Sequence, residues 1–298
     1  MKGDESMTNL QIRQTNSADV ILPMTEAAAA DWYRQQGMQI FYHQGHYWKQ
    51  TKFGFYEPIN LLARLTAKQA TCPKKIHLGF RASLCEADAA TANGSIPIHL
   101  LSDVESYNLQ SLSANRRNHL KRCHKRAQIL QLLSPDLLEE QGYDVFYSAT
   151  IRFGGKVIPK KVYLSQLAKH LPSKQRYVFA GLINDKLGGY MTTYVVDGTA
   201  YIERALLATE ALSAYIGTGL VFEFVQACRR SGKIREIVYG YHTPKDPALS
   251  TFKEGMGFPV RHIPAKVAVH PLIDPIFRWR YSSAYYFLTG KYPMAGKK

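Results

Sequence analysis

The segment Tyr201–Phe258 constrains the fold more than any other part of the chain, because its pattern changes from strand to helix and back over a short distance. It predicts a strand, a glycine-containing turn, a helix, a second strand, a polar loop and a short helix. A glycine turn that opens a helix beside a strand presents backbone N–H groups without partners, and the helix dipole adds positive potential there. This turn therefore favours the binding of a phosphate or another oxyanion.

Further strands flank this segment. Three alternating stretches predict strands over Arg176–Leu182, Lys186–Val196 and Thr199–Leu207. Turns at Asn184-Asp185 and Asp197-Gly198 join them into an antiparallel meander. Helices are expected over Val145–Ile151, Lys161–His170, Gly219–Arg230 and Leu249–Glu254, and further strands over Ile234–Tyr241 and Val260–Val269. The pattern predicts an α+β fold with a mixed, largely antiparallel sheet flanked by helices.

The N-terminal part predicts a second, smaller α/β lobe. Thr25 can cap a helix that runs to Gln36 and contains four consecutive alanines. The aromatic stretch Gln39–Tyr56 alternates and contains glycines, so it predicts strands joined by turns. Short strands are also expected over Ile76–Phe80 and Ile96–Leu101.

A basic helix is predicted over Leu109–Leu133. Its apolar residues recur at three- and four-residue steps, broken only by Arg116, and form one stripe: Leu109, Leu112, Leu120, Cys123, Ala127 and Leu130. No carboxylate occurs between Glu105 and Asp136, so the helix cannot balance its charge by pairs on its own surface. It needs acidic groups from elsewhere or an anionic ligand. It could contact RNA phosphates, lie at an acidic lipid surface, or bridge two lobes.

The bulk composition narrows the class of protein. The 298 residues carry a net charge of +15, which favours polyanionic partners such as nucleic acid, acidic membrane surfaces or phosphate-bearing cofactors. Apolar runs are too short to cross a bilayer, and residues 1–20 are too polar for a secretory signal. The cysteines, Cys72, Cys85, Cys123 and Cys228, show no metal spacing, and His43 with His46 lacks a third ligand. We expect a cytoplasmic protein without a metal site.

The order of basic helix, meander, glycine turn, helix, strand and helix resembles the GNAT acyltransferase superfamily, and in particular its Fem-type and cellulose-biosynthesis-type branches with two GNAT-like halves. The acyl-CoA turn of that superfamily follows the pattern Arg/Gln-x-x-Gly-x-Gly/Ala. The matching frame here is Ala214 to Gly219, with Gly217 and Gly219 in place and Ala214 at the first, normally basic or amide, position. The resemblance implies that Gly217, Thr218 and Gly219 hold the donor, and that acetyl-CoA or another acyl-CoA is that donor. Lys253, in the short helix that ends at Gly257-Phe258, is expected to contact an anionic donor or acceptor, and the alternative is an exposed lysine without a role.

The resemblance also implies where catalytic groups lie. Acyl transfer needs a base for the nucleophile and a group that stabilises an oxyanion or protonates a leaving group. Glu203 lies on the strand before the glycine turn, where the superfamily places a base, and the alternative is that it pairs with a charge on a neighbouring strand. Tyr241 and His242 end the next strand, where a tyrosine could protonate a leaving group and a histidine could carry a proton. Packing is the alternative for each.

These observations predict a polar leader (1–20), an N-terminal lobe that the resemblance implies to be a degenerate GNAT-like copy (21–108), a GNAT-like domain (109–270) and a basic aromatic tail (271–298). The leading hypothesis is transfer of an acyl group from acyl-CoA to the amine or hydroxyl group of a small-molecule or peptide acceptor. The first alternative is a Fem-like transferase that uses aminoacyl-tRNA, which the Ala214 substitution and the net charge favour. The second is a non-catalytic protein that binds a polyanion, either tRNA or an acidic membrane surface.

Overall fold

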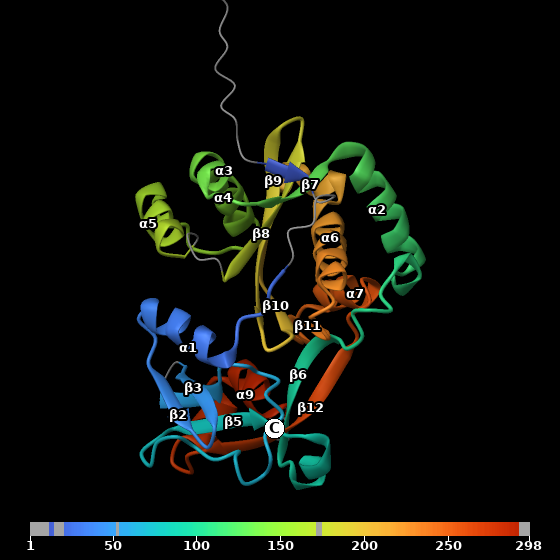
Figure 1. The fold of residues 1–298 in the computed structure, drawn as a ribbon. Coiled ribbons are helices and arrows are strands. Elements are labelled where there is room, and N and C mark those ends of the chain that lie inside the picture. Colours follow the sequence, from blue (N-terminus) through green and yellow to red (C-terminus); the bar gives the residue numbers. More distant parts are fainter. Residues whose placement is uncertain (1–11, 15–20, 52–53, 171–174, 292–298) are drawn as a thin grey trace, which may run out of the picture. The chain divides into compact units, whose positions relative to one another are not determined.

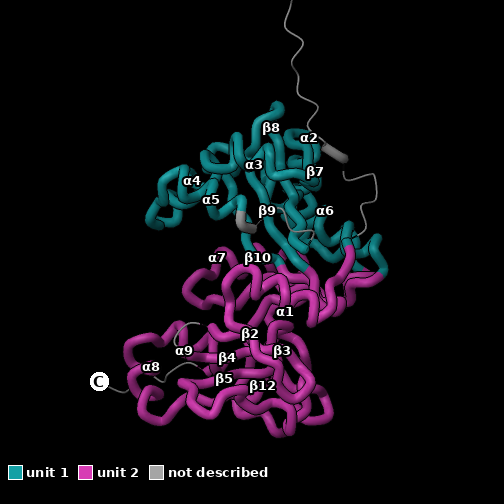
Figure 2. The backbone as a smooth tube through the Cα atoms, turned by 60° about the vertical axis from the view of Figure 1, so that its left-hand side comes forward, with its two compact units in different colours: residues 1–21, 107–194, 202–232 teal, residues 22–106, 195–201, 233–298 magenta. Residues whose placement is uncertain are grey.

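The computed structural model describes residues 12–14, 21–51, 54–170 and 175–291. Their contacts form two compact units (Figure 2). Unit 1 consists of residues 1–21, 107–194 and 202–232, and unit 2 of residues 22–106, 195–201 and 233–298. The contacts thus group residues 233–298 with the N-terminal part of the chain, whereas the sequence analysis expected one domain over 109–270. Most of the predicted leader lies outside the described residues.

Unit 1 is built on an antiparallel sheet with the strand order β1-β7-β8-β9-β10. Its strands are β1 (Ile12–Gln14), β7 (Gln128–Leu132), β8 (Arg176–Ile183), most of β9 (Lys186–Val196) and the second part of β10 (Thr199–Leu207). Asn184 and Asp185 join β8 to β9 with φ angles of 48° and 62°, the conformation that a tight hairpin requires. The predicted meander is confirmed, and β9 and β10 have the predicted limits.

The helices of unit 1 are α2 (Ala114–Arg126), α3 (Asp136–Glu140), α4 (Gly142–Arg152), α5 (Lys160–His170) and α6 (Ile216–Ser231). Helix α6 packs against β7, β8 and α2, and Figure 1 shows α2 and α6 side by side. The Phe224 ring of α6 meets Phe179 of β8 edge-on at 5.5 Å. These buried apolar contacts form the core of unit 1.

The predicted single helix over Leu109–Leu133 is wrong at both ends. Leu109–Ser111 form a short 3-10 helix, and α2 begins only after Ser113, whose hydroxyl accepts a hydrogen bond from Arg116 N. The residue Ala127 is extended, and Gln128–Leu132 pair with β8 as strand β7. The helical spacing continued by chance into β7, where a partner strand decides the conformation.

Unit 2 contains the strand order β10-β11-β6-β12-β5-β4-β3-β2. Its strands are β2 (Ile40–His43), β3 (His46–Gln50), β4 (Phe55–Pro58), β5 (Gly79–Ser83), β6 (Gly94–Leu101), β11 (Glu236–Tyr241), β12 (Val260–Val269) and the start of β10. Strands β4 and β5 are parallel, as are β10 and β11, and the other pairs are antiparallel. A cluster around Trp48, Leu65 and Phe80 forms a core on this sheet.

The helices of unit 2 are α1 (Glu26–Gln35), α7 (Pro247–Gly255), α8 (Asp274–Arg280) and α9 (Ser282–Thr289). Thr25 caps α1 as predicted, because its side chain accepts a hydrogen bond from Ala28 N. Helices α8 and α9 form from the predicted basic aromatic tail, and α9 packs against β6. Short 3-10 helices cover Glu86–Thr91 in unit 2 and Thr209–Ala214 in unit 1. Within the described residues, no helix combines the length and the apolar character needed to cross a bilayer.

Candidate active site

A pocket of about 760 Å³ lies in unit 2. Its wall is mostly apolar and comes from β4, β5, β11, α8 and α9, with Phe55, Phe277 and Phe287 among its rings. The charged side chains of the wall are Glu57 and Arg81, and its hydroxyl groups come from Thr51, Tyr56, Tyr241 and Tyr281. An apolar cavity with a few convergent polar groups is the arrangement typical of a small-molecule site.

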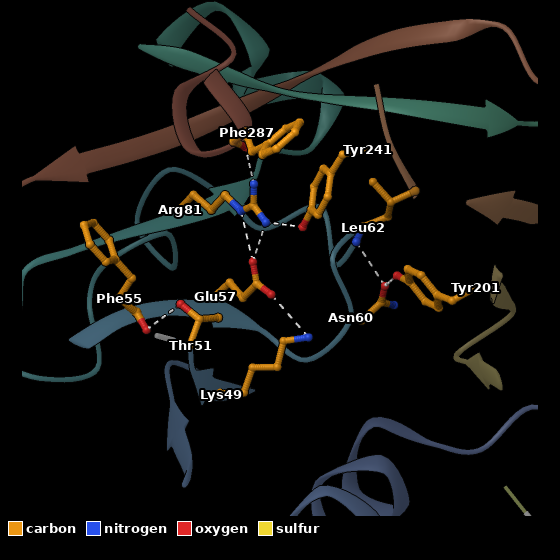
Figure 3. A network of polar contacts seen from close by, with 10 residues as sticks. All are labelled: Lys49, Thr51, Phe55, Glu57, Asn60, Leu62, Arg81, Tyr201, Tyr241 and Phe287. Atoms are coloured by element: carbon orange, nitrogen blue, oxygen red, sulfur yellow. Dashed lines mark hydrogen bonds and ion pairs between the residues drawn. The ribbon is translucent and has the colours of Figure 1, made fainter. Parts of the chain in front are cut away.

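The charged part of this wall is a buried network (Figure 3). Arg81 Nη2 lies 2.6 Å and Arg81 Nε 3.0 Å from Glu57 Oε2, while Lys49 Nζ lies 3.2 Å from Glu57 Oε1. Arg81 also donates to the carbonyl oxygen of Phe287 and to the hydroxyl oxygen of Tyr241. The arginine thus links β4 and β5 to α9 and β11. Two cations share one carboxylate, so the network holds one excess positive charge.

The ion pairs of this network shift the pKa values of Glu57 and Lys49. Burial raises the pKa of Glu57, but the charges of Arg81 and Lys49 outweigh this effect and lower the pKa to about 2. Burial lowers the pKa of Lys49, and the Glu57 carboxylate reverses that effect, so the pKa of Lys49 is raised. Glu57 is therefore ionised at neutral pH and is a poor proton acceptor. The network can instead stabilise a negative charge in the pocket.

A β-bulge determines where Tyr241 lies. The register between β11 and β6 shifts between Val238 and Tyr241, and Gly240 has a φ of +68°. Tyr239 consequently packs on Phe252 and Phe258, whereas Tyr241 faces Arg81 and Phe287. Burial raises the pKa of Tyr241, so its phenol stays protonated. Because Arg81 donates to the phenol oxygen, the hydroxyl hydrogen can itself be donated.

His242 and Lys253 lie near the same strand end. His242 Nδ1 is 2.9 Å from the Tyr286 hydroxyl, and its ring centre is 5.6 Å from that of His99. Burial lowers the pKa of His242, with His262 adding to the effect. Lys253 is buried, with Nζ 4.9 Å from the centre of the Tyr239 ring. Burial lowers the pKa of Lys253 to about 8, and Asp246 opposes the shift. Tyr241 lines the pocket, whereas His242 and Lys253 lie near the same strand end but are not among the lining residues of the pocket.

The predicted donor turn lies in unit 1 and differs from the expectation. Helix α6 begins at Ile216, so Gly217, Thr218 and Gly219 form its first turn and do not precede it. The turn itself is made by Tyr215, which has a φ of 58°. A Cβ on Gly219 would lie 2.6 Å from Cys123 Sγ of α2, so this glycine permits close packing of the two helices.

Basic groups of α2 surround this helix start. The His119 ring stacks on Tyr215 at 4.0 Å, and Arg122 Nη1 lies 3.3 Å from the Tyr215 hydroxyl. Arg126 Nη1 donates to Ser213 O at 3.2 Å. The basic helix therefore lies against the predicted donor turn within the same unit.

Glu203 also lies in unit 1. Its carboxylate accepts from Arg176 Nη2 at 2.7 Å and from Thr192 Oγ1 at 3.1 Å. This is the pairing across strands that the sequence analysis weighed against a catalytic role. His43 Nε2 lies 2.8 Å from Thr71 Oγ1, and no group of three or more metal-ligating side chains occurs among the described residues.

Sequence reasoning missed Lys49, Glu57 and Arg81. Each is the only Asp, Glu, Lys or Arg in its strand, and this is the only local signal that they carry. A charged residue that interrupts a buried strand needs a buried partner, and that rule could have identified Glu57 and Arg81 as a pair.

Comparison with known proteins identifies the fold. No protein-family model matches the chain, and no curated protein matches its sequence. Among solved structures, the C-terminal domain of an Agrobacterium fabrum protein named as a lysylphosphatidylglycerol synthetase is similar, with a TM-score of 0.55 and 12% identity over 89% of this chain and 93% of that one. FemX gives a TM-score of 0.56 with 9% identity over 89% and 96% of the two chains.

L-PGS from Bacillus licheniformis gives a TM-score of 0.56 with 12% identity over 90% of this chain and 93% of that one. Each of these matches spans both units, so the similarity extends beyond a single GNAT half. At such identities the likeness concerns the fold. The chain therefore has the GNAT fold, in the form shared by FemX and the lysylphosphatidylglycerol synthetases.

Proposed function

We propose that this chain is an acyltransferase that transfers an acyl group to an amine or hydroxyl group of an amphiphilic acceptor. The observation that supports the proposal is the apolar pocket of unit 2, whose wall includes Glu57 and Arg81, with Lys49 paired to Glu57 behind them. A lipid chain is compatible with the apolar wall, and the excess positive charge favours an anionic headgroup. Lysylphosphatidylglycerol, which names one of the similar folds, is a phosphatidylglycerol that carries a lysyl ester, so the lipid that is acylated to make it is anionic.

The proposed chemistry uses groups around the end of β11. The nucleophile of the acceptor attacks the acyl carbonyl carbon, and the donor leaves with the electron pair of the broken bond. Tyr241 donates a hydrogen bond to the developing oxyanion, and Arg81 holds the tyrosine in place. His242, and Lys253 in its neutral form, are the proposed proton acceptors, since the pKa of each is lowered. Glu203, bound to Arg176 and Thr192, remains the base proposed for unit 1.

Two donors are compatible with this proposal. Acyl-CoA would bind through Gly217, Thr218 and Gly219 at the start of α6 in unit 1, as the resemblance implies. An aminoacyl-tRNA is favoured by a separate observation: Lys121 and Lys125 are exposed on α2, and Gly219 already has a packing role. The two donors differ in charge and size, so direct assay separates them.

The test supplies the full chain with micelles of phosphatidylglycerol and either labelled acetyl-CoA or tRNA charged with a labelled amino acid. We expect label in the organic extract with one of the two donors. Ala284→Trp places a large side chain in the pocket wall and should raise KM for the amphiphile, whereas Ala28→Trp, on an exposed helix position outside the pocket, should not. Absence of transfer from both donors, or equal effects of the two variants, would refute the proposal.

A further inference from the structure

Helix α8 exposes an apolar face that is not covered by any other residue described in the structure. Leu272, just before the helix, is 78% exposed, and Ile276 and Trp279 within it are 55% and 84% exposed. The steps of four and three residues place these side chains on one side of the helix. Large apolar side chains are seldom grouped in this way on a surface that contacts only water.

The other side of α8 is anchored in unit 2. Ile273 and Phe277 line the pocket, and the Phe277 ring lies 5.2 Å from the ring of Phe55 in β4. Figure 2 shows α8 beside α9 in unit 2, and the two helices pack together. The inner face therefore holds the helix in place, so that the outer face is presented on a fixed element.

Basic residues accompany the apolar face. Residues 271–298 contain one acidic residue, Asp274, and the basic residues Arg278, Arg280, Lys291, Lys297 and Lys298. Arg278 Nε pairs with Asp274 at 2.6 Å, whereas Arg280 lies over the Tyr281 ring at 6.0 Å and is exposed. Asp274 thus neutralises one of these cations, and residues 271–298 keep a net positive charge.

We propose that α8 docks on the surface of a bilayer that contains anionic phospholipids. Leu272, Ile276 and Trp279 enter the boundary between headgroups and acyl chains, and Arg280 contacts lipid phosphates. A tryptophan beside arginines suits this boundary, because the ring has an apolar body and a polar N–H group. Charge complementarity favours an anionic bilayer over an uncharged apolar partner.

The position of α8 also relates the docked face to the pocket. Ile276 and Tyr281 are exposed and line the pocket as well, so the pocket opens beside the proposed membrane contact. A lipid could then pass from the bilayer into the pocket without crossing water. Only this transfer of a lipid to the pocket rests on the proposed function, since the docking itself does not require catalysis.

The fluorescence emission of Trp279 can report binding of the protein to vesicles. Trp32 and Trp48 are 3% and 0% exposed, so a shift of tryptophan emission on adding vesicles reports mainly on Trp279. The full chain is titrated with vesicles of phosphatidylcholine alone, and with vesicles of phosphatidylcholine mixed with phosphatidylglycerol. We expect a blue shift, and quenching by brominated acyl chains, with the anionic vesicles.

Variants test the residues of the face by co-sedimentation with the same vesicles. Ile276→Ser and Trp279→Ser should each lower the partition coefficient about tenfold, because each removes a buried apolar side chain from the docked state. Arg280→Gln should lower it about fivefold and weaken its salt dependence. Phe153→Ser, at a 71% exposed aromatic residue of unit 1, is the matched control and should bind as the parent does.

Three outcomes would overturn the proposal: no binding to anionic vesicles, an equal loss in Phe153→Ser, or an emission shift that depends on protein concentration without vesicles. The last would identify a second copy of the chain as the partner, which sedimentation velocity would measure. Transfer to a detergent-solubilised acceptor without vesicle binding would refute the docking alone. Vesicle binding without any transfer would refute only the proposed function.

Discussion

Arg81 donates a hydrogen bond to the hydroxyl oxygen of Tyr241, and its guanidinium carbon lies 4.7 Å from the centre of the same tyrosine ring. The arginine therefore fixes both the position of the ring and the direction of its hydroxyl group. Such fixed donors are effective in catalysis, because they need no reorganisation when charge develops on the substrate.

Tyr241→Phe should lower kcat of the proposed transfer about 100-fold or more, since it removes one fixed donor and keeps the ring. KM for the acceptor should change little, and the thermal midpoint should fall, because buried Arg81 loses one hydrogen-bond acceptor. Tyr239→Phe is the matched control, because Tyr239 lies on the same strand but packs on Phe252 and Phe258. Equal rates in the two variants would show that the Tyr241 hydroxyl has no part in the reaction.

Because of Glu57, the free energy of unfolding of the protein should fall as the pH is lowered. The pKa of Glu57 is about 2 in the folded state and near 4.5 without its partners, so the folded state binds the proton more weakly. Its contribution is complete above about pH 4.5 and is lost as the pH falls towards 2. Glu57→Gln leaves Arg81 and Lys49 buried without their carboxylate, which should cost about 3–5 kcal/mol at neutral pH and less in acid.

Urea unfolding of Glu57→Gln and of the parent protein, at neutral pH and in acid, measures this difference in the free energy of unfolding. Asp31→Asn is the control, because Asp31 pairs with Arg34 on the exposed surface of α1 and such pairs contribute about 1 kcal/mol or less. A Glu57→Gln variant as stable as Asp31→Asn at neutral pH would contradict the network described here.

Lys253 should also make the stability rise with pH, but in a higher pH range than Glu57. The pKa of Lys253 is about 8 in the folded state and 10.5 in the unfolded chain, so the unfolded chain binds the proton more tightly. The cost of burying the charged amine is complete below about pH 8 and disappears as the pH rises through 10.5. Lys253→Met should therefore raise the free energy of unfolding at pH 7, and the gain should shrink near pH 10.

Chemical denaturation at the two pH values tests this prediction. Lys121→Met, at an exposed position of α2, should show no comparable gain. A Lys253→Met variant that is less stable than the parent at pH 7 would mean that the lysine is held by interactions stronger than its contact with Tyr239.

Much of the fold could be predicted from the sequence, because turns and alternation are local signals. Strands β9, β10 and β12 have the predicted limits, and both connecting turns have the residues that positive φ angles favour. The helix predicted over Leu109–Leu133 failed where β7 begins, because Ile129 faces Gly181 of β8 and the partner strand overrides the helical spacing.

The candidate site was harder to predict, because it too depends on contacts between residues that are far apart in the sequence. Tyr241, His242 and Lys253 were identified from their place at a strand end and in the next helix. The network that surrounds Tyr241 was missed, because Glu57 and Arg81 are 24 residues apart and Arg81 and Tyr241 are 160 apart. Local patterns do not report pairings over such separations.

The basic helix α2 allows a test of the donor. Lys121→Gln combined with Lys125→Gln removes two exposed charges while keeping Arg122 and Arg126, which contact Tyr215 and Ser213. If tRNA is the donor, its affinity should fall and the log–log dependence on salt should lose about 0.7–0.9 in slope for each phosphate contact removed. Filter binding at several salt concentrations measures this slope. An unchanged salt dependence of tRNA affinity in the folded double variant would show that Lys121 and Lys125 of α2 do not contact tRNA.

The role of Gly219 can be separated from donor binding. Gly219→Ala places a Cβ 2.6 Å from Cys123 Sγ and 3.0 Å from Ile129 Cγ1, so we expect a loss of about 1–3 kcal/mol in stability from overpacking. Because Sγ is the nearest atom, Cys123→Ala should be less harmful in the Gly219→Ala background than in the parent. A favourable coupling of about 0.5–3 kcal/mol in the double-mutant cycle would identify packing as the reason for this glycine.

Acetyl-CoA binding by the same variants, measured by calorimetry below their unfolding transitions, completes the argument. If Gly219 is needed only for the approach of α6 to α2, Gly219→Ala should bind acetyl-CoA as the parent does while it is folded, with or without Cys123→Ala. If the glycine instead lets a pyrophosphate approach the backbone, Gly219→Ala should weaken binding in fully folded protein, and Cys123→Ala should not restore it. The second result would establish the start of α6 as the donor site.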